Sequence, residues 1–472
     1  MPVFFSPADR LMSFFIRSKI IINRILKKTY TALQRTLPGP DFGKSWIVFI
    51  PYIAAAILAA AVSVFYSQLF HYVETSVLYT AALHPYTMLL LTPLCFYLSW
   101  LLVTTFAPAA GGSGIPQVIA SLDLVAMEKT SWIERLLSFR MAVVKIISST
   151  VALAGGAAVG REGPTLQISA TIFYLTHRYL PASWVKLNLQ KMLIAGGSAG
   201  LAAAFNTPLG GIVFAIEELT KTHISNIRSS MFIAVIVAGM TAQLFLGPYL
   251  YLGYPQVAAF TLSQIPYVLL IAALGGFASG WSCSIILAIF RWKRSLKKIW
   301  MNHFFVIGSG IAMALLIVAV GPLAAASGRE TLLTLLFPSD VHVEWYLLPA
   351  RFAGSIISYS AGLAGGVFAP ALATGSTIGG LVVDLFHLDP NNKIYVLCGM
   401  IAFLTGVTHS PFTSSILVLE MTDRHAAIFP MMLAGLIANV AAKAVSEKSF
   451  YDSLKENFLP QEEQNPPSPE KL

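Results

Sequence analysis

Long apolar stretches joined by short polar connections run along almost the whole chain. A helix needs about 20 apolar residues to cross a bilayer, and stretches near that length cover residues 46–69, 86–107, 141–159, 231–252, 265–290, 304–327 and 425–444. Shorter stretches, interrupted by glycine or proline, cover 113–122, 163–175, 192–205, 207–219, 366–382, 394–406 and 411–421. Because broken helices in a membrane must be buried in protein or line a cavity, the pattern predicts an all-α polytopic membrane protein with broken helices that do not span alone.

The composition supports this class. The 472 residues are 56% hydrophobic and only 11% charged, with a mean hydropathy of +0.71, whereas soluble domains carry about 25% charged residues. The net charge of +9 is concentrated in basic clusters within residues 1–40 and 291–298. Such clusters favour the cytoplasmic face of a membrane. In so apolar a chain we expect no nucleic-acid partner.

The ends of the chain differ from its middle. Residues 1–44 are predicted to be a cytoplasmic segment, in which 11–28 have the pattern of an amphipathic helix lying on the membrane. Residues 452–472 are polar and proline-rich near their end, which predicts a disordered tail. The three cysteines and nine histidines form neither a disulfide framework nor a metal motif, so we expect no metal and no cofactor.

Charged residues and prolines recur at matching spacings in the two halves of the chain, which indicates an internal repeat. Lys145 precedes Glu162 by the same number of positions as Arg351 precedes Phe368, and each pair is followed by a proline at the same offset. A second match pairs the segment from Asn206 to Glu217 with the segment from His409 to Glu420. Membrane transporters built from two such copies place their substrate at the repeat interface, on broken helices.

Glu162 stands between two strongly apolar stretches, in Gly-Arg-Glu-Gly-Pro at 160–164. A carboxylate at membrane depth is costly and marks a path for ions or protons by default. The glycines and Pro164 indicate a helix start, whose free N–H groups and partial positive charge attract an anion. Glu162 is then an anion tethered at a site for mobile anions. The alternative is a carboxylate paired with Arg161 in a polar loop.

Three segments together resemble the signature segments of the CLC family of chloride channels and chloride/proton antiporters. They are Gly-Ser-Gly-Ile-Pro at 112–116, Gly-Arg-Glu-Gly-Pro at 160–164 and Gly-Gly-Val-Phe-Ala-Pro at 365–370, with Tyr451 as a fourth match. The resemblance covers about residues 45–455. It implies a CLC-type fold of two inverted repeats with tilted and broken helices, and a homodimer with one anion pathway per subunit.

The resemblance also implies domain bounds and residue roles. The transmembrane domain covers 45–451, with one repeat at about 45–250 and the other at about 260–451. Glu162 is the external gate, and Glu218 matches the internal proton-transfer glutamate of the antiporters. The expected chloride-binding residues are Ser113, Ile115, Glu162, Gly163, Val367, Phe368, Ala369 and Tyr451.

Elementary chemistry supports these roles. Chloride must shed its water, and amides and hydroxyls bind it weakly enough to release it. A carboxylate can fill an anion site only while ionised, so protonation of Glu162 would free it to swing away and link chloride entry to proton uptake. Glu217 has Glu420 as its repeat mate, which favours a structural role, whereas Glu218 is matched by Met421. Both acids could instead be solvated at a helix end.

Some residues depart from the family pattern. Residues 360–364 lack the proline that many relatives have there. Gln117 and Ile119 stand where carboxylates occur in the family, so the inner proton route is predicted to use other residues. Ser113 argues against the nitrate-preferring members. Lys145 and Arg351 are predicted either to hold buried carbonyl groups or to tune the potential of the pore.

We therefore expect a multi-pass protein of the bacterial inner (plasma) membrane that exchanges chloride for protons and is not an enzyme. Its expected partners are chloride, protons, membrane lipid and a second copy of the chain. A passive chloride channel of the same fold is the close alternative, which would not need Glu218. A membrane enzyme that cradles phosphate on helix starts is the alternative from another class; it would need a nucleophile with a base, or a metal cluster.

Overall fold

The structure is a computed structural model that describes residues 47–181, 184–220, 229–247, 250–296, 298–338 and 342–460. These residues are almost entirely helical, and their only β pairing is two isolated bridges. The helix predicted over 11–28 lies outside the described residues. The α-helices are α3 Ile50–Leu83, α4 Met88–Phe106, α5 Ile115–Ala126, α6 Thr130–Leu136, α7 Phe139–Ala154, α8 Glu162–Tyr179, α9 Leu189–Phe205, α10 Pro208–Phe214, α11 Ser229–Leu246, α12 Ile265–Ser295, α13 Ile299–Val320, α14 Arg329–Leu336, α15 Leu347–Ser360, α16 Phe368–Leu385, α17 Ile394–Thr408, α18 Pro411–Thr422, α19 Ile428–Val445 and α20 Phe450–Lys455.

Eight helical stretches in the described ranges are long and apolar enough to cross a membrane. Seven overlap the seven long stretches predicted from the pattern, which confirms a multi-pass membrane protein. The eighth, Phe368–Leu385, was predicted to be too short, and this prediction was wrong. Its glycines do not interrupt the helix, and two of them, Gly375 and Gly379, pack against the backbone of α17.

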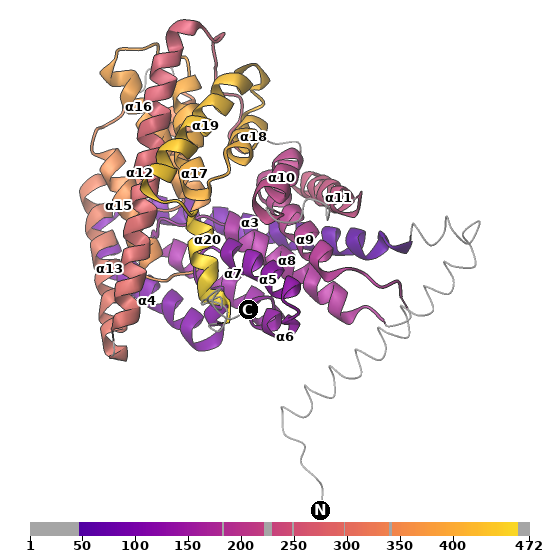
Figure 1. Cartoon of the computed structure of the whole chain (residues 1–472). Helices are drawn as coiled ribbons and strands as arrows, with labels where there is room; N and C mark the ends of the chain where they lie inside the picture. The colour runs from indigo at the N-terminus through magenta and orange to yellow at the C-terminus, as the bar shows by residue number, and fades with distance from the viewer. Residues whose placement is uncertain are drawn as a thin grey trace, which may run out of the picture.

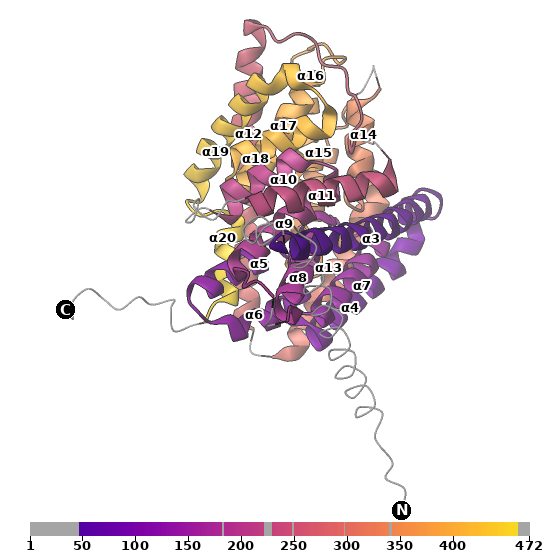
Figure 2. The same ribbon diagram turned by 90° about the vertical axis from the view of Figure 1, so that its right-hand side faces the viewer.

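The second half of the chain repeats the order of helices seen in the first half: two long helices, followed by shorter ones. In Figure 1 most of the first half, indigo to magenta, gathers on one side of the molecule, and the helices α16 to α19 of the second half gather on the other, while the yellow α20 reaches back to α5 of the first half. Figure 2 shows α3 crossing the first half as one long, tilted helix. The halves meet where the segments before α8 and α16 pair through reciprocal hydrogen bonds of Gly160 and Gly366, as expected for copies related by a two-fold rotation.

Small residues let α16 and α17 approach closely, as is common in membrane helix packing. A β-carbon on Gly399 would clash with the carbonyl oxygen of Gly375, and one on Gly375 would clash with the carbonyl oxygen of Gly399. Both helices are almost completely buried. The close approach therefore fixes the position of α16, whose first residues belong to the third signature segment.

Gly399→Ala is expected to destabilise the protein by about 1–3 kcal/mol, because overpacking forces the two backbones apart. The measurement is the thermal unfolding midpoint in detergent. Gly308→Ala is the matched control, since a β-carbon at that position of α13 meets nothing within 4 Å. A midpoint that falls equally in both variants would contradict the packing argument.

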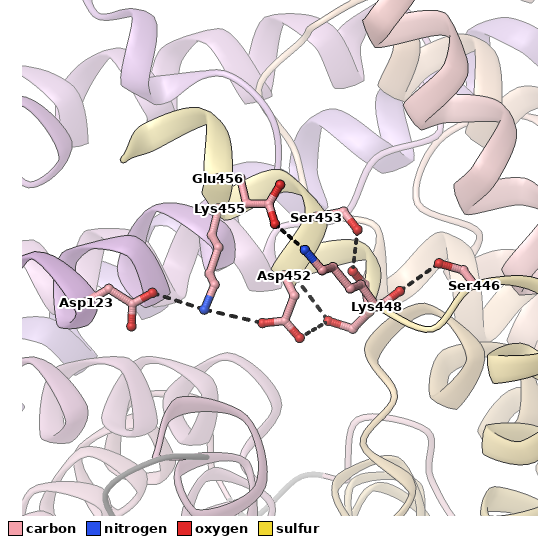
Figure 3. A network of polar contacts seen from close by, with 8 residues as sticks. Asp123, Ser446, Lys448, Asp452, Ser453, Lys455 and Glu456 are labelled. Carbon is pink, nitrogen blue, oxygen red and sulfur yellow. Dashed lines mark hydrogen bonds and ion pairs between the residues drawn. The ribbon is translucent and has the colours of Figure 1, made fainter. Parts of the chain in front are cut away.

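The C-terminal end of the described chain is helical, which corrects the prediction that the disordered tail begins at residue 452. Helix α20 is followed by a 3-10 turn over Glu456–Phe458. Figure 3 shows the polar network that holds this segment. Lys455 pairs with Asp123 of α5 at 3.0 Å, and Lys448 pairs with Glu456 at 2.6 Å. The first contact ties α20, and with it Tyr451, to α5, and the second links the two ends of the C-terminal segment.

Candidate functional site

The three signature segments are joined by backbone hydrogen bonds. The Gly112 N–H donates to Leu363 O at 2.8 Å, and the Gly365 N–H donates to Gly112 O at 3.0 Å. Gly160 and Gly366 donate to each other at 2.8 and 2.7 Å. This small ladder brings the starts of α5, α8 and α16 together. Since the first N–H groups of a helix lack partners within it, three sets of donors that the helices do not use converge on one buried place.

Gly114 shows why glycine is needed before α5. It has φ +104°, in the left-handed region that other residues rarely adopt. A β-carbon there would also collide with Gln167 and with the backbone of Gly163. The turn at Gly114 directs the chain from Ser113 into α5, so that the serine sits directly at the helix start.

Two hydroxyl groups lie at this convergence. Ser113 is 1% exposed and Tyr451 0% exposed, and their hydroxyl groups face each other. Neither hydroxyl oxygen is within hydrogen-bonding distance of a partner in the part of the chain that the structure describes. The Tyr451 ring stacks on Phe368, with the centroids 6.4 Å apart and the planes at 7°. A buried hydroxyl without a partner costs about 1–3 kcal/mol, so the pair indicates a place where a ligand accepts hydrogen bonds.

Glu162 is the first residue of α8 and is 1% exposed. This contradicts the alternative of a carboxylate in a polar loop. The carboxylate turns back toward Gly160, where a β-carbon would clash with it, and it faces the N–H of Ala369 at the start of α16. Its second oxygen has no hydrogen-bond partner among the described residues. The carboxylate thus occupies the helix-start donors itself, as a tethered anion.

The structure brings all the residues predicted to bind chloride to these helix starts. Gly163 lies against the Ser113 hydroxyl, and a β-carbon on Gly160 would lie 3.1 Å from that of Ala369. Ile115 and Phe368 are fully buried as the first residues of α5 and α16, and Val367 is the N-cap of α16.

Tyr359 is a site residue that the sequence did not reveal. Its hydroxyl accepts the Ser113 N–H at 3.0 Å, and its ring packs on Phe450, the neighbour of Tyr451, with the centroids 5.4 Å apart. Tyr359 therefore positions the backbone of Ser113. No motif marks it, because a tyrosine in an apolar helix usually serves only to fill the core.

A cavity of about 720 Å³ leads to Ser113 from one side. Lys293 and Arg294 line it, so it opens on the face that the basic cluster predicts to be cytoplasmic. The Lys293 ammonium group donates to the carbonyls of Ser360 and Ala361 at 3.0 and 3.2 Å. These bonds fix the turn before the third signature segment, where the sequence lacks the proline found in many relatives.

A second cavity, of about 230 Å³, reaches Glu162 from another part of the molecule. Its lining includes Arg161, Tyr251 and Arg329, and both guanidinium carbons lie 5.9 Å from the centre of the Tyr251 ring. We call this the outer cavity and the cavity beside Lys293 the inner cavity. The convergent helix starts connect the two, with Glu162 lining the outer cavity and Ser113 lining the inner one.

Glu218 is buried, which contradicts the alternative that it is solvated at a helix end. It is 1% exposed, lies on a π-helical turn over Ala215–Leu219, and accepts a hydrogen bond from the Ser410 hydroxyl at 2.6 Å. A buried carboxylate that reaches across to the other repeat is suited to hold and pass a proton.

Glu217 has a structural role, as predicted from its match with Glu420 in the other repeat. It accepts the N–H groups of Phe412 and Thr413 at the start of α18, at 3.2 and 2.6 Å. Glu420 in turn accepts the N–H groups of Leu209 and Gly210 at the start of α10, at 3.1 and 2.8 Å. Each repeat therefore caps a helix of the other, which fastens the two halves together.

Lys145 and Arg351 both donate hydrogen bonds to backbone carbonyls, which is the first of the two roles predicted for them. Lys145 donates to the carbonyls of Ala110 and Gly112, each at 2.8 Å. Arg351 donates to Ala325 O at 2.9 Å. Both side chains are fully buried, and each fixes the turn that precedes a helix start.

Comparisons with known proteins agree with this geometry. A sequence model of the family described as voltage gated chloride channel matches residues 95–443. The chain is 28% identical to the H(+)/Cl(-) exchange transporter ClcA of Salmonella typhi, over 77% of this chain and 79% of the relative. The crystal structure of a slow cyanobacterial Cl-/H+ antiporter superposes with a TM-score of 0.75 at 22% identity, over 87% of this chain and 97% of that one. A CLC-type fluoride/proton antiporter superposes with a TM-score of 0.72 at 20% identity, over 88% and 99%. These likenesses confirm the predicted CLC-type fold.

Proposed function

We propose, from the premise that this chain belongs to the CLC family of voltage-gated chloride channels, that it is a secondary active transporter exchanging chloride for protons. The observation that carries the proposal is the buried carboxylate of Glu162, which occupies convergent helix-start donors between two cavities. The alternative is a passive chloride channel of the same fold. Glu218 favours the antiporter, since it is buried at the position where the antiporters carry a proton-transfer glutamate, a group that a channel does not need.

The chloride route is supported by the donors that surround it. Chloride would pass from the inner cavity to the Ser113 and Tyr451 hydroxyls and the N–H groups of Val367 and Phe368. Replacing its hydration shell by amides and hydroxyls, rather than by a full positive charge, keeps binding weak enough for release. The anion would reach the outer cavity only when the Glu162 carboxylate leaves the helix starts.

The proton route would use Glu162 and Glu218. Glu162 would take a proton from the outer cavity, lose its negative charge and leave the anion site to chloride. Glu218 would exchange protons with the cytoplasmic side. Gln117 is already engaged as a donor to the carbonyls of Ala109 and Gly111, so it would serve the fold rather than the inner proton route.

We also propose that two chains form a homodimer in the bacterial inner membrane, in contact with lipid, and that the protein acts as a transporter and not as an enzyme. The neighbouring helices α10 and α18 each present a large apolar side chain directly after their first proline. These are Leu209, 55% exposed, and Phe412, 46% exposed. Since the two mark equivalent positions of the two repeats, the pair forms an apolar face suited to a second copy.

The test is proton movement in liposomes that hold the purified full-length protein. A chloride gradient is imposed while valinomycin and potassium clamp the voltage. Proton movement against its own gradient is expected. Chloride flux without any proton movement would instead make the protein a channel or an uncoupled transporter.

Ser113→Ala is expected to weaken chloride binding about tenfold, because the variant loses one hydrogen bond to a charged ligand. The measurement is isothermal titration calorimetry of chloride into detergent-solubilised protein. Ser121→Ala is the matched control, since Ser121 is also a buried serine of α5 but donates to the backbone oxygen of Gln117. Unchanged chloride affinity in Ser113→Ala would remove this hydroxyl from the site.

A further inference from the structure

The helix start at α14 is built like the one at α5. Ser327 and Gly328 precede α14 as Ser113 and Gly114 precede α5, and both glycines have positive φ, +89° and +104°. The turn before each helix is held by a buried cation of the corresponding repeat position. Lys145 donates to Gly112 O, and Arg351 donates to Ala325 O and Ala326 O.

The two helix starts differ in what they hold. The Ser113 hydroxyl has no partner within hydrogen-bonding distance in the described ranges, whereas Ser327 donates both its N–H, at 3.1 Å, and its hydroxyl to the carboxylate of Glu74. Glu74 is 5% exposed and lies within the long membrane helix α3. A carboxylate at such a position is costly unless its charge is compensated, so this pairing accounts for its presence.

The surroundings of Glu74 favour anions. Arg329 and Arg161 line the same outer cavity as Glu74 and Glu162. Arg351 lies directly behind Gly328, where a β-carbon would clash with its guanidinium group. The Arg351 Nε is fully buried and has no hydrogen-bond partner in the described structure. Two guanidinium groups therefore share the outer cavity with the two carboxylates, and a third lies behind the start of α14.

We propose that the start of α14 is a second anion site, the counterpart in repeat two of the site at Ser113, and that the Glu74 carboxylate is its resident anion. By filling this site, Glu74 prevents the guanidinium groups at the outer cavity from holding chloride tightly. Glu74 is thus a specificity-determining residue for anion entry. The proposal rests on the proposed function only in taking chloride as the anion that passes.

Glu74→Ala removes the charge and leaves room beside Ser327. Crystals of this variant grown in bromide are expected to show one additional anomalous peak per chain at Ser327, and Glu74→Ala combined with Ser327→Ala should lose it. A well-folded Glu74→Ala protein without a bromide peak at Ser327 overturns the proposal.

Glu74→Gln keeps the shape of the side chain, which guards against a folding defect. Chloride binding by calorimetry is expected to tighten at least roughly fivefold, the lower end of typical couplings between two bound ligands. Glu330→Gln, at an exposed acid of the same helix α14, is the control for a general loss of negative charge. Unchanged affinity in Glu74→Gln, or an equal change in Glu330→Gln, overturns the proposal.

Both readouts measure halide binding and need no proton coupling. A protein that fails the proton-transport test can therefore still pass or fail this one. Conversely, the absence of chloride binding to the wild-type protein would count against the proposed function rather than against the role of Glu74.

Discussion

Glu162→Gln is expected to abolish proton transport while chloride still flows. Glutamine has nearly the same shape as glutamate, but it can neither carry a titratable proton nor occupy the helix-start donors as an anion. The variant therefore mimics the protonated, neutral form of Glu162 at every pH. Proton flux in the liposome assay should fall by at least about two orders of magnitude, the range over which a positioned proton-transfer group contributes.

The control for this variant is again Glu330→Gln, whose carboxylate is exposed and lies outside the cavity linings described above. Coupled transport should persist in the control. If Glu162→Gln still moved protons against their gradient in proportion to chloride, another group would carry the proton. The tethered anion would then be a gate for chloride alone.

Glu218→Ala is expected to stop proton transport from the opposite end of the pathway. The variant removes the carboxylate that Ser410 binds at 2.6 Å and leaves the donors at the chloride site untouched. Chloride flux should therefore persist, while proton flux in the liposome assay falls by about two orders of magnitude. Calorimetry should find chloride affinity close to that of the wild type.

Glu217→Gln is the matched control, since it neutralises the adjacent acid. Glu217 caps the start of α18, so its neutralisation should lower the thermal midpoint by the equivalent of about 1 kcal/mol and leave coupling intact. Proton transport that survives in Glu218→Ala, or that is lost equally in Glu217→Gln, would show that Glu218 is not the specific inner acceptor.

Several features could be predicted from the sequence because they depend on local signals. Apolar length identified seven of the eight membrane-crossing stretches, and the glycines and prolines around Ser113, Glu162 and Phe368 marked helix starts. The equal spacing of Lys145 and Arg351 from these segments predicted a repeat. The structure adds that the two cations serve the same purpose in both copies, holding the turn before a helix.

Other predictions failed where packing overrides local pattern. Helix α16 is long enough to span although its sequence is rich in glycine, because Gly375 and Gly379 let it pack closely along α17. Residues 452–458 are helical although they are polar, because Lys455 and Asp123 connect them to α5. In both cases the deciding contact is made with another helix, and for Lys455 and Asp123 that helix is far away in the chain.

The sequence by itself determined the membrane class, the residue types at the anion site and the existence of two copies, since each follows from apolar length, helix-start chemistry or spacing. Only the tertiary structure decided which helix starts meet and which polar groups face them. Tyr359 positions Ser113, Ser410 holds Glu218 across the repeat interface, and Glu74 fills the start of α14. Each of these contacts joins residues more than 190 positions apart, and their pairing depends on how the two repeats pack together.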